Sequence, residues 1–187
     1  MTRIIAGSLG GRRIVTPSGP HIRPTTDRVR EALFSALESM VELPGARFAD
    51  LYAGSGAVGL EALSRGAAHV LFVEADPRTS RVIRENVAAL GVGSATQVVT
   101  GKVPAVLAGG PDGGPYDVVF ADPPYAVDDR ELTALQLALR DEGWLAPEAV
   151  VVIERATRSG PLPWVDGIVA GRSRRYGETT LWYGFRS

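Results

Sequence analysis

Two sequence patterns alternate along most of the chain. Short runs rich in apolar and β-branched residues, typical of buried strands, occur at 47–52, 69–75, 96–100, 116–121 and 149–155. Helices are predicted between these runs, at 57–66, 77–91, 103–109 and 129–141, with Pro77 suited to a first helical turn. Repeated strand–helix units predict an α/β fold with a mostly parallel sheet covered by helices on both faces.

The two ends of the chain depart from this alternation. "RIIAG" (3–7) and "RRIVTP" (12–17) flank "SLGG", which predicts a small β-hairpin. A helix is expected over 25–40, with Thr26 or Asp27 as its cap. Residues 165–186 contain two strand patterns without a helix between them, so these strands are expected to pair antiparallel. We therefore expect a hairpin arm over 1–22 and one main domain over 23–187.

Composition narrows the class of protein. With 187 residues, 45% of them apolar, the chain can bury a sizeable core. No apolar run is long enough to span a membrane, and "MTRIIAGSLGGRR" does not resemble a signal peptide, so we expect a cytoplasmic protein. There is no cysteine, which excludes disulfides, zinc–thiolate sites and cysteine nucleophiles. The two histidines, His21 and His69, are far apart, and no metal site is expected.

Charge is distributed unevenly although the net charge is −1. Residues 1–30 contain six Arg and one Asp, and residues 172–187 contain four Arg and one Glu, so the middle of the chain is acidic. Basic ends on an acidic middle suggest a local anion-binding face. Lys102 is the only lysine, so an Arg-rich composition explains the pattern equally well, and nucleic-acid binding stays open on charge alone.

A glycine loop marks the first candidate site. Gly54-x-Gly56-x-x-Gly59 lies between a predicted strand and a predicted helix, and Glu74 ends the next strand. Glycines allow a close backbone approach to a ligand, and a carboxylate at Glu74 could accept both hydroxyls of a ribose. A nicotinamide dinucleotide and S-adenosylmethionine both fit this pattern. Asp50 could reach a methionine ammonium, directly or through water, or could cap a helix or turn.

The segment "VVFADPPY" (118–125) marks the second candidate site. Two prolines end a strand abruptly and stiffen the backbone that follows. Asp122 and the carbonyl of Pro123 could accept hydrogen bonds from an exocyclic amine, and Tyr125 could stack on the base that carries it. Both sites follow strands of the same parallel sheet, where ligands bind beyond the carboxyl ends of the strands.

These motifs carry a family resemblance. "DLYAGSG", "FVEAD" and "ADPPY", in this order, resemble class I S-adenosylmethionine-dependent methyltransferases that act on amino groups. "RIIAGSLGGRRI", "RPTTDRVREALFSAL" and "YGETTLWYGFR" resemble the bacterial 16S ribosomal RNA guanine-N2 methyltransferase family, from near Arg3 to about Arg186. The resemblance implies a Rossmann-like, seven-stranded sheet with an antiparallel last strand. It also implies methylation of the N2 of a specific guanine, of the guanine 966 type.

Carried over residue by residue, the resemblance implies roles for three groups of residues. Those implied to hold S-adenosylmethionine are Asp50, Gly54, Ser55, Gly56, Glu74, Ala75 and Val103. Those implied to hold the target guanine as catalytic residues are Asp122, Pro123 and Tyr125. Those implied to contact RNA from the hairpin and the Arg-rich helix are Arg3, Arg12, Arg13, Arg23, Arg28 and Arg30. The implied partner is 16S ribosomal RNA in the small ribosomal subunit or a late assembly intermediate. A monomer is expected because nothing in the sequence suggests an obligate oligomer.

One position departs from the pattern of such enzymes. Lys102 stands near the place where an Asp or Asn often receives the adenine amino group, so this contact is expected at the backbone of Val103.

Four other functions stay open. Adenine-N6 methyltransferases share "DPPY", and protein glutamine methyltransferases usually have Asn in place of Asp122. A nicotinamide-dependent oxidoreductase would leave "ADPPY" unexplained. A non-catalytic ribosome-assembly factor would not need the intact acid and glycine loop.

Overall fold

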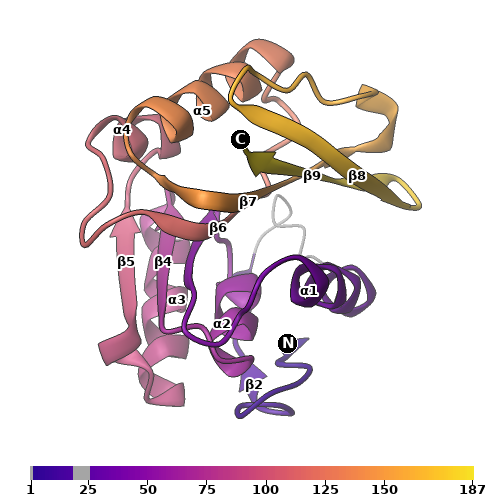
Figure 1. The fold of residues 1–187 in the computed structure, drawn as a ribbon. Helices are drawn as coiled ribbons and strands as arrows, with labels where there is room; N and C mark the ends of the chain where they lie inside the picture. The colour runs from indigo at the N-terminus through magenta and orange to yellow at the C-terminus, as the bar shows by residue number, and fades with distance from the viewer. Residues whose placement is uncertain (1, 19–25) are drawn as a thin grey trace.

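Seven strands form one mixed sheet in the computed structural model, which describes residues 2–18 and 26–187. Their order is β5-β4-β3-β6-β7-β9-β8 (Figure 1). Their bounds are Arg47–Leu51 (β3), His69–Glu74 (β4), Thr96–Thr100 (β5), Tyr116–Ala121 (β6), Leu145–Ala156 (β7), Ile168–Tyr176 (β8) and Thr179–Arg186 (β9). Strands β3 to β7 pair in parallel, whereas β9 runs antiparallel to both of its neighbours. The predicted sheet with an antiparallel last strand is confirmed.

In the described part of the chain, five α-helices cover the two faces of the sheet. Helices α1 (Asp27–Met40), α2 (Ala57–Ser64) and α3 (Pro77–Leu90) lie on one face with the N-terminal hairpin, and α4 (Val103–Ala108) and α5 (Asp129–Asp141) lie on the other (Figure 1). Side chains of Thr26, Asp76 and Asp128 cap α1, α3 and α5 by accepting backbone N–H groups of the first turn. Among the helices described, none is both long and apolar enough to cross a membrane.

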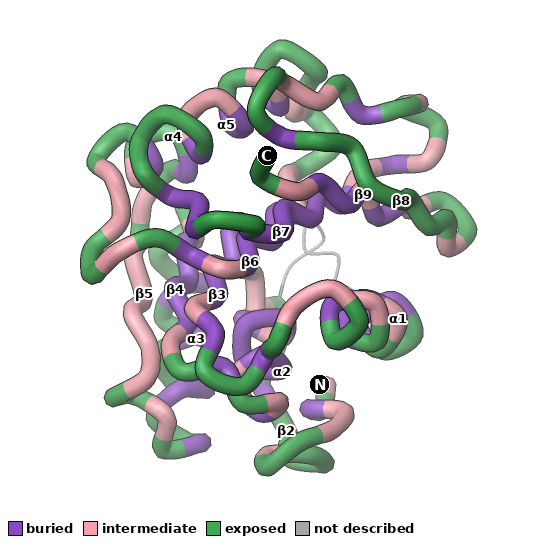
Figure 2. The backbone as a smooth tube through the Cα atoms, viewed as in Figure 1, coloured by how far each residue is buried: buried purple, intermediate pink, exposed green. Residues whose placement is uncertain are grey.

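The core consists of two apolar layers, one on each face of the sheet. In β6, Val118 and Phe120 belong to the layer beneath α1, α2 and α3, whereas Val119 and Ala121 belong to the layer beneath α4 and α5. This alternation follows from the two-residue period of a strand. The central strands are buried along most of their length, whereas β8 is exposed along most of its length (Figure 2). The buried centre provides a rigid support for the loops at the strand ends.

Two segments differ from the prediction by more than two residues at one end. The hairpin strands β1 (Thr2–Arg3) and β2 (Arg13–Ile14) pair antiparallel over two residues each, fewer than predicted. The reason is that the backbone N–H groups after Ile4 donate to a helix side chain rather than to a partner strand. Strand β7 begins four residues earlier than predicted, because an irregularity in the β6–β7 register and the left-handed Glu148 (φ 63°) extend it through a Pro-containing stretch.

Candidate active site

The candidate site lies where four parallel strands end together. Leu51 pairs with Val73 and with Ala121, and Glu74 pairs with Thr100, so β3, β4, β5 and β6 end at the same edge of the sheet. The loops that follow enclose a cavity of about 400 Å³. Its lining consists of Tyr52, Gly54, Glu74, Ala75, Asp76, Thr79, Val103, Asp122, Pro123, Pro124 and Tyr125. This position and volume match the usual ligand crevice of an open α/β sheet.

The glycine loop between β3 and α2 takes its shape from left-handed backbone conformations. Tyr52, Gly54 and Gly56 have φ of 59°, 58° and 84°. The last two conformations favour glycine, whereas an aromatic residue in this region is strained by about 1–3 kcal/mol. Gly59 meets a different requirement, since a Cβ there would lie 2.4 Å from the ring of Phe72. The glycines therefore set the loop and the close packing of α2 on β4.

Glu74 fixes the glycine loop from the neighbouring strand. One carboxylate oxygen accepts the backbone N–H of Gly54 at 2.9 Å, and the other accepts the N–H of Asp76 at 3.0 Å. The side chain is half-buried and lines the cavity, and a carboxylate has lone pairs left to accept further hydrogen bonds. The sequence pattern placed this acid at the strand end, and the structure adds that it also shapes the loop.

Asp50 lies outside the cavity lining. It is 1% exposed, and its carboxylate accepts the backbone N–H of Gly59 at 2.9 Å, in the first turn of α2. Burial raises the pKa of this carboxyl well above its ordinary value, the Gly59 hydrogen bond opposes that rise, and Glu74 adds to it. The structure shows Asp50 as a helix cap beneath the loop, which is one of the two roles considered for it. Its contact with a ligand ammonium, directly or through water, stays a prediction.

The "ADPPY" segment leaves the sheet beside the glycine loop. Because Ala121 pairs with Leu51, Asp122 and Tyr52 are the next residues on adjacent strands. Asp122 is half-buried, Pro123 is half-buried, and the Tyr125 side chain is 58% exposed. The N–H of Val127 donates to the carbonyl of Pro124 at 3.0 Å, which closes a turn before α5. The segment thus presents an acid, a stiff backbone and an exposed ring at one side of the cavity.

Seven of the ten residues predicted for catalysis and cofactor binding line this one cavity: Gly54, Glu74, Ala75, Val103, Asp122, Pro123 and Tyr125. Ser55 and Gly56 lie in the loop but not in the lining, and the carbonyl of Ser55 accepts the side-chain amide of Asn86 at 3.1 Å. The exposed Lys102 lies just before α4 and is not among the lining residues, whereas Val103 is buried and lines the cavity. Lys102 stands where such enzymes often have an Asp or Asn, and at this point of the chain Val103, not Lys102, forms part of the cavity wall.

Four lining residues were not predicted. Pro124 was within the quoted motif, and Asp76 and Thr79 form the start of α3, where the Thr79 hydroxyl donates to the Asp76 carboxylate at 2.9 Å. Tyr52 was also within a quoted motif. Its left-handed backbone conformation could not be predicted, because aromatic residues rarely adopt it. Asp76 follows the strand that ends at Glu74 and precedes Pro77, a pattern typical of a helix cap, and this pattern could have indicated that Asp76 lies at the cavity. Among the described residues, no group of three or more acids and histidines could hold a metal ion.

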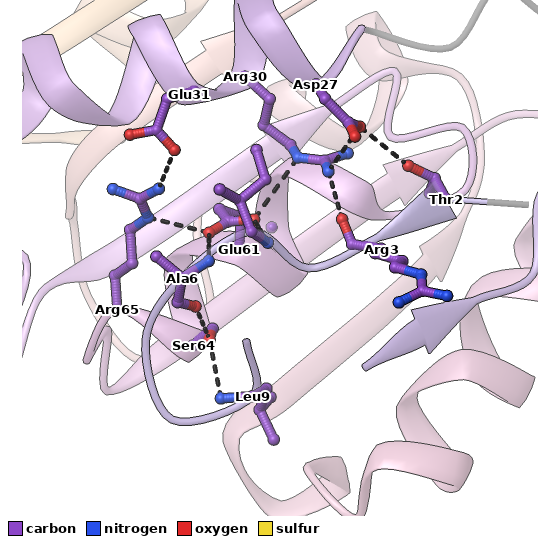
Figure 3. Close-up of polar contacts among 12 residues, drawn as sticks. Thr2, Arg3, Ala6, Leu9, Asp27, Arg30, Glu31, Glu61, Ser64 and Arg65 are labelled. Carbon is purple, nitrogen blue, oxygen red and sulfur yellow. Dashed lines mark hydrogen bonds and ion pairs between the residues drawn. The ribbon is translucent and has the colours of Figure 1, made fainter. Parts of the chain in front are cut away.

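The N-terminal hairpin is fastened to the core by a buried polar network (Figure 3). The Glu61 carboxylate, fully buried on α2, accepts the backbone N–H groups of Ile5 at 2.8 Å and Ala6 at 3.1 Å. The same carboxylate pairs with Arg65 at 2.9 Å and lies 3.5 Å from Arg30. The Ser64 hydroxyl donates to the carbonyl of Ala6 and accepts the N–H of Leu9 at 2.9 Å, so the arm is held at several points.

Arg30 is a structural residue, contrary to the expectation that it contacts RNA. Its side chain is fully buried and donates to the carbonyl of Arg3 and to the Asp27 carboxylate (Figure 3). Burial lowers the pKa of this guanidinium, and the neighbouring carboxylates oppose that change. Arg3, Arg12, Arg13 and Arg28 are exposed, and Arg23 lies outside the described residues.

Comparison with known proteins places the chain in a family. The sequence profile of the family described as conserved hypothetical protein 95 matches residues 2–184. Ribosomal RNA small subunit methyltransferase D of Escherichia coli strain K12 is 44% identical over 163 residues, which cover 87% of this chain and 78% of the relative. The chain belongs to the family described as conserved hypothetical protein 95. A putative rRNA methyltransferase of Bacillus subtilis, YlbH, is 35% identical over 95% of each chain.

Solved structures agree with the fold. The putative methyltransferase yhhF from Escherichia coli superposes with a TM-score of 0.86 at 35% identity, covering 98% of this chain and 97% of that one. Magnesium protoporphyrin IX methyltransferase from Synechocystis, solved with bound S-adenosylmethionine, superposes with a TM-score of 0.66 at 16% identity, covering 86% and 79%. The second likeness concerns the fold alone, which is that of a class I methyltransferase.

Proposed function

We propose that this protein is an S-adenosylmethionine-dependent methyltransferase that methylates the N2 amino group of a guanine in 16S ribosomal RNA. One observation carries the proposal. A single cavity of about 400 Å³ joins a glycine loop with its ribose-type acid to an acid–proline–proline–tyrosine segment. The named rRNA methyltransferases among the relatives support both the reaction and the RNA.

The residues of the cavity fit the cofactor. Gly54 lines it with a left-handed backbone and open space where a Cβ would stand, so the loop can approach a ligand closely. Glu74 would accept ribose hydroxyls, and Ala75, Asp76 and Val103 would surround the adenine. When bound, S-adenosylmethionine supplies a methyl group on a positively charged sulfur. Asp50, Ser55 and Gly56 do not line the cavity and would instead stabilise the conformation of the glycine loop.

Asp122 and Pro123 would orient the amine. An exocyclic amine is a poor nucleophile because its lone pair is delocalised into the ring. A hydrogen bond from the amine to the Asp122 carboxylate, with a second to the Pro123 carbonyl, would aim the lone pair and favour the positive charge that develops on nitrogen. The cofactor would supply the methyl group to this nitrogen, and the methylated amine would then lose a proton to Asp122 or to water.

Guanine is favoured over adenine by the same carboxylate. Asp122 could accept from guanine N1–H and N2–H together, whereas adenine N1 is itself an acceptor. Tyr125, which lines the cavity and remains exposed, would stack on the base after it leaves its own stack. We propose a guanine of the 966 type in the small subunit or a late assembly intermediate as the target, and a cytoplasmic monomer as the active form. Residues 1–22 would serve this domain as an RNA-contacting arm.

The test identifies the product nucleoside. Small ribosomal subunits from a strain that lacks this protein are incubated with it and with tritiated S-adenosylmethionine, and the RNA is digested to nucleosides. Label in N2-methylguanosine is expected. Label in N6-methyladenosine would overturn guanine in favour of the adenine alternative. Absence of label in any nucleoside, with tight cofactor binding, would overturn the proposed RNA substrate.

A further inference from the structure

The edge of the sheet that carries the cavity continues past Tyr125 to a group of exposed arginines. Strand β7 runs parallel to β6, and Ile153 pairs with Ala121, so the end of β7 lies at the cavity edge. The short 3₁₀ turn Thr157–Ser159 follows β7. In this turn the exposed Arg158 places its guanidinium over the ring of Tyr125, 5.4 Å from the centroid. A cation thus lies against the ring that is proposed to stack on the base.

The turn that carries Arg158 is tied to the β8–β9 hairpin. The N–H of Thr157 donates to the carbonyl of Glu178 at 2.8 Å, and its hydroxyl donates to the carbonyl of Gly177 at 3.2 Å. In register, Ala156 pairs with Thr179, and Thr179 pairs with Tyr176. Two strand spacings separate Ala156 from Tyr176, about 10 Å. The surface is therefore continuous from the cavity to the end of β8.

Further arginines lie along this edge. Arg174 and Arg175 are exposed on the edge strand β8, where consecutive side chains leave opposite faces of the sheet. The Arg175 guanidinium donates to the carbonyl of Gly177 at 2.9 Å, which holds it at the turn. Arg28, exposed near the start of α1, lies over the ring of Tyr176 at 5.9 Å. One acid, Glu178, is exposed in the same turn. Arg155 is excluded because its guanidinium is paired with Asp129 at 2.8 Å.

We propose that Arg158, Arg175, Arg174 and Arg28 form a docking strip for the phosphates that flank the target base. This inference rests on the proposed function and adds where the RNA runs. The strip begins at the ring on which the base would stack, so a strand whose base enters the cavity would bring its neighbouring phosphates within reach of these cations. Arginines match phosphate geometry, and Asp27 and Asp129, two exposed acids near these four arginines, are already paired with Arg30 and Arg155.

The arm arginines lie elsewhere. Arg12 donates to the carbonyl of Ala89 at 3.2 Å, in the last turn of α3. Helix α3 starts beside the cavity at Pro77, and Ala89 is twelve residues further, about 18 Å along the helix. RNA that contacts the arm would therefore do so at a distance from the target base, whereas the docking strip begins at the base itself.

The test measures affinity apart from turnover. Binding of small subunits that lack the methyl group is measured over a series of salt concentrations, with S-adenosylhomocysteine present. Arg158→Glu is compared with Arg81→Glu, which makes the same charge change at an exposed position on α3. Arg158→Glu is expected to weaken binding about tenfold at low salt and to lower the salt slope by about one. Arg81→Glu is expected to stay within about twofold of the unsubstituted protein, and Arg158→Lys, which keeps the charge, is expected to lose less affinity than Arg158→Glu.

Each outcome decides between the claims. Unchanged affinity and salt slope in Arg158→Glu, or an equal loss in Arg81→Glu, would overturn the docking strip while methylation by the unsubstituted protein still supports the proposed function. Loss of S-adenosylhomocysteine affinity in Arg158→Glu would also overturn it, because the effect would then lie in the cavity. Absence of methyl transfer by the unsubstituted protein would overturn the proposed function, and the affinities would still decide the strip.

Discussion

The arm and the cavity rim are both rich in arginine, but their arginines have different environments. Beneath the arm, Arg30 on α1 is fully buried beside Glu61, and in the arm itself Arg12 donates to the carbonyl end of a helix. At the rim, Arg158, Arg174 and Arg175 are exposed on a turn and an edge strand. The sequence shows a similar excess of positive charge at both ends. The structure distinguishes the two groups of arginines. A paired and buried guanidinium stabilises the fold, whereas an exposed guanidinium can bind a substrate.

This comparison predicts that rim substitutions cost activity, whereas substitutions in the buried network beneath the arm cost stability. The largest effect is expected at Asp122. Asp122→Ala removes the acceptor for the amine and is expected to lower kcat about 100- to 1,000-fold. Cofactor affinity, measured by calorimetry, and the melting temperature should stay near those of the unsubstituted protein, because the residue is half-buried at the cavity edge. Asp122→Asn is the matched control that keeps the shape without the charge. Equal losses of cofactor affinity and turnover would contradict the assigned role.

At the arm, the corresponding substitution is Glu61→Ala. It removes the buried carboxylate that lies between Arg30 and Arg65, and it leaves the N–H groups of Ile5 and Ala6 without their acceptor. The free energy of unfolding is expected to fall by about 3–5 kcal/mol, as for other broken buried pairs. Urea denaturation measures this loss. Glu38→Ala on α1 is the matched control, since it removes an exposed partner of Arg65 and should cost less than about 1 kcal/mol. Equal costs for the two substitutions would refute the structural role of the buried network.

The Asp50 carboxyl supplies a pH test of the support beneath the glycine loop. Its pKa is raised by burial, so between 3.8 and the raised value the native state binds more protons than the unfolded state. The stabilisation from this group is therefore present at low pH and is lost as pH rises through the native pKa. Asp50→Asn keeps an acceptor for Gly59 and should flatten this part of the stability curve, measured by urea denaturation from about pH 4 to about pH 8.

Cofactor affinity separates the two roles considered for Asp50. Asp50→Asn is expected to bind S-adenosylmethionine within about threefold of the unsubstituted protein, because the hydrogen bond to the α2 turn survives. Asp50→Ala removes that acceptor and is expected to bind more weakly. A large loss of affinity in Asp50→Asn, at unchanged stability, would show that the charge itself reaches the ligand.

The smallest effect is expected from reversing Arg12 and Arg13 together. Both side chains are exposed, so stability should change little, and RNA binding and its salt dependence should weaken. The loss is expected to be smaller than for Arg158→Glu, because Arg12 lies at the far end of α3 from the cavity. Affinity measured over the same salt series makes the comparison. A larger loss at the arm would reverse the order of the two regions, and unchanged binding would remove the arm as an RNA contact.

The sequence predicted the parts of the molecule that depend on local pattern. The alternation of strand and helix, the strand ends at Glu74 and Ala121, and the grouping of the glycine loop with Asp122 follow from short-range periodicity and from the geometry of parallel sheets. The burial of Arg30 did not follow, because it depends on Glu61 and on an arm segment 56 residues away from that acid. Asp50 was ambiguous for a similar reason. A carboxylate at a strand end can face a ligand or cap the next helix, and only the packing decides.

The most direct test of the central claim is the contact between Tyr125 and the target base. The protein is cross-linked by ultraviolet light to small subunits that lack the methyl group, with S-adenosylhomocysteine present, and the adducts are identified by mass spectrometry. A guanine attached to the peptide that contains Tyr125, lost in Tyr125→Ala but kept in Arg12→Glu, is the predicted result. Adducts confined to the arm peptide, or an adenine at Tyr125, would contradict the account.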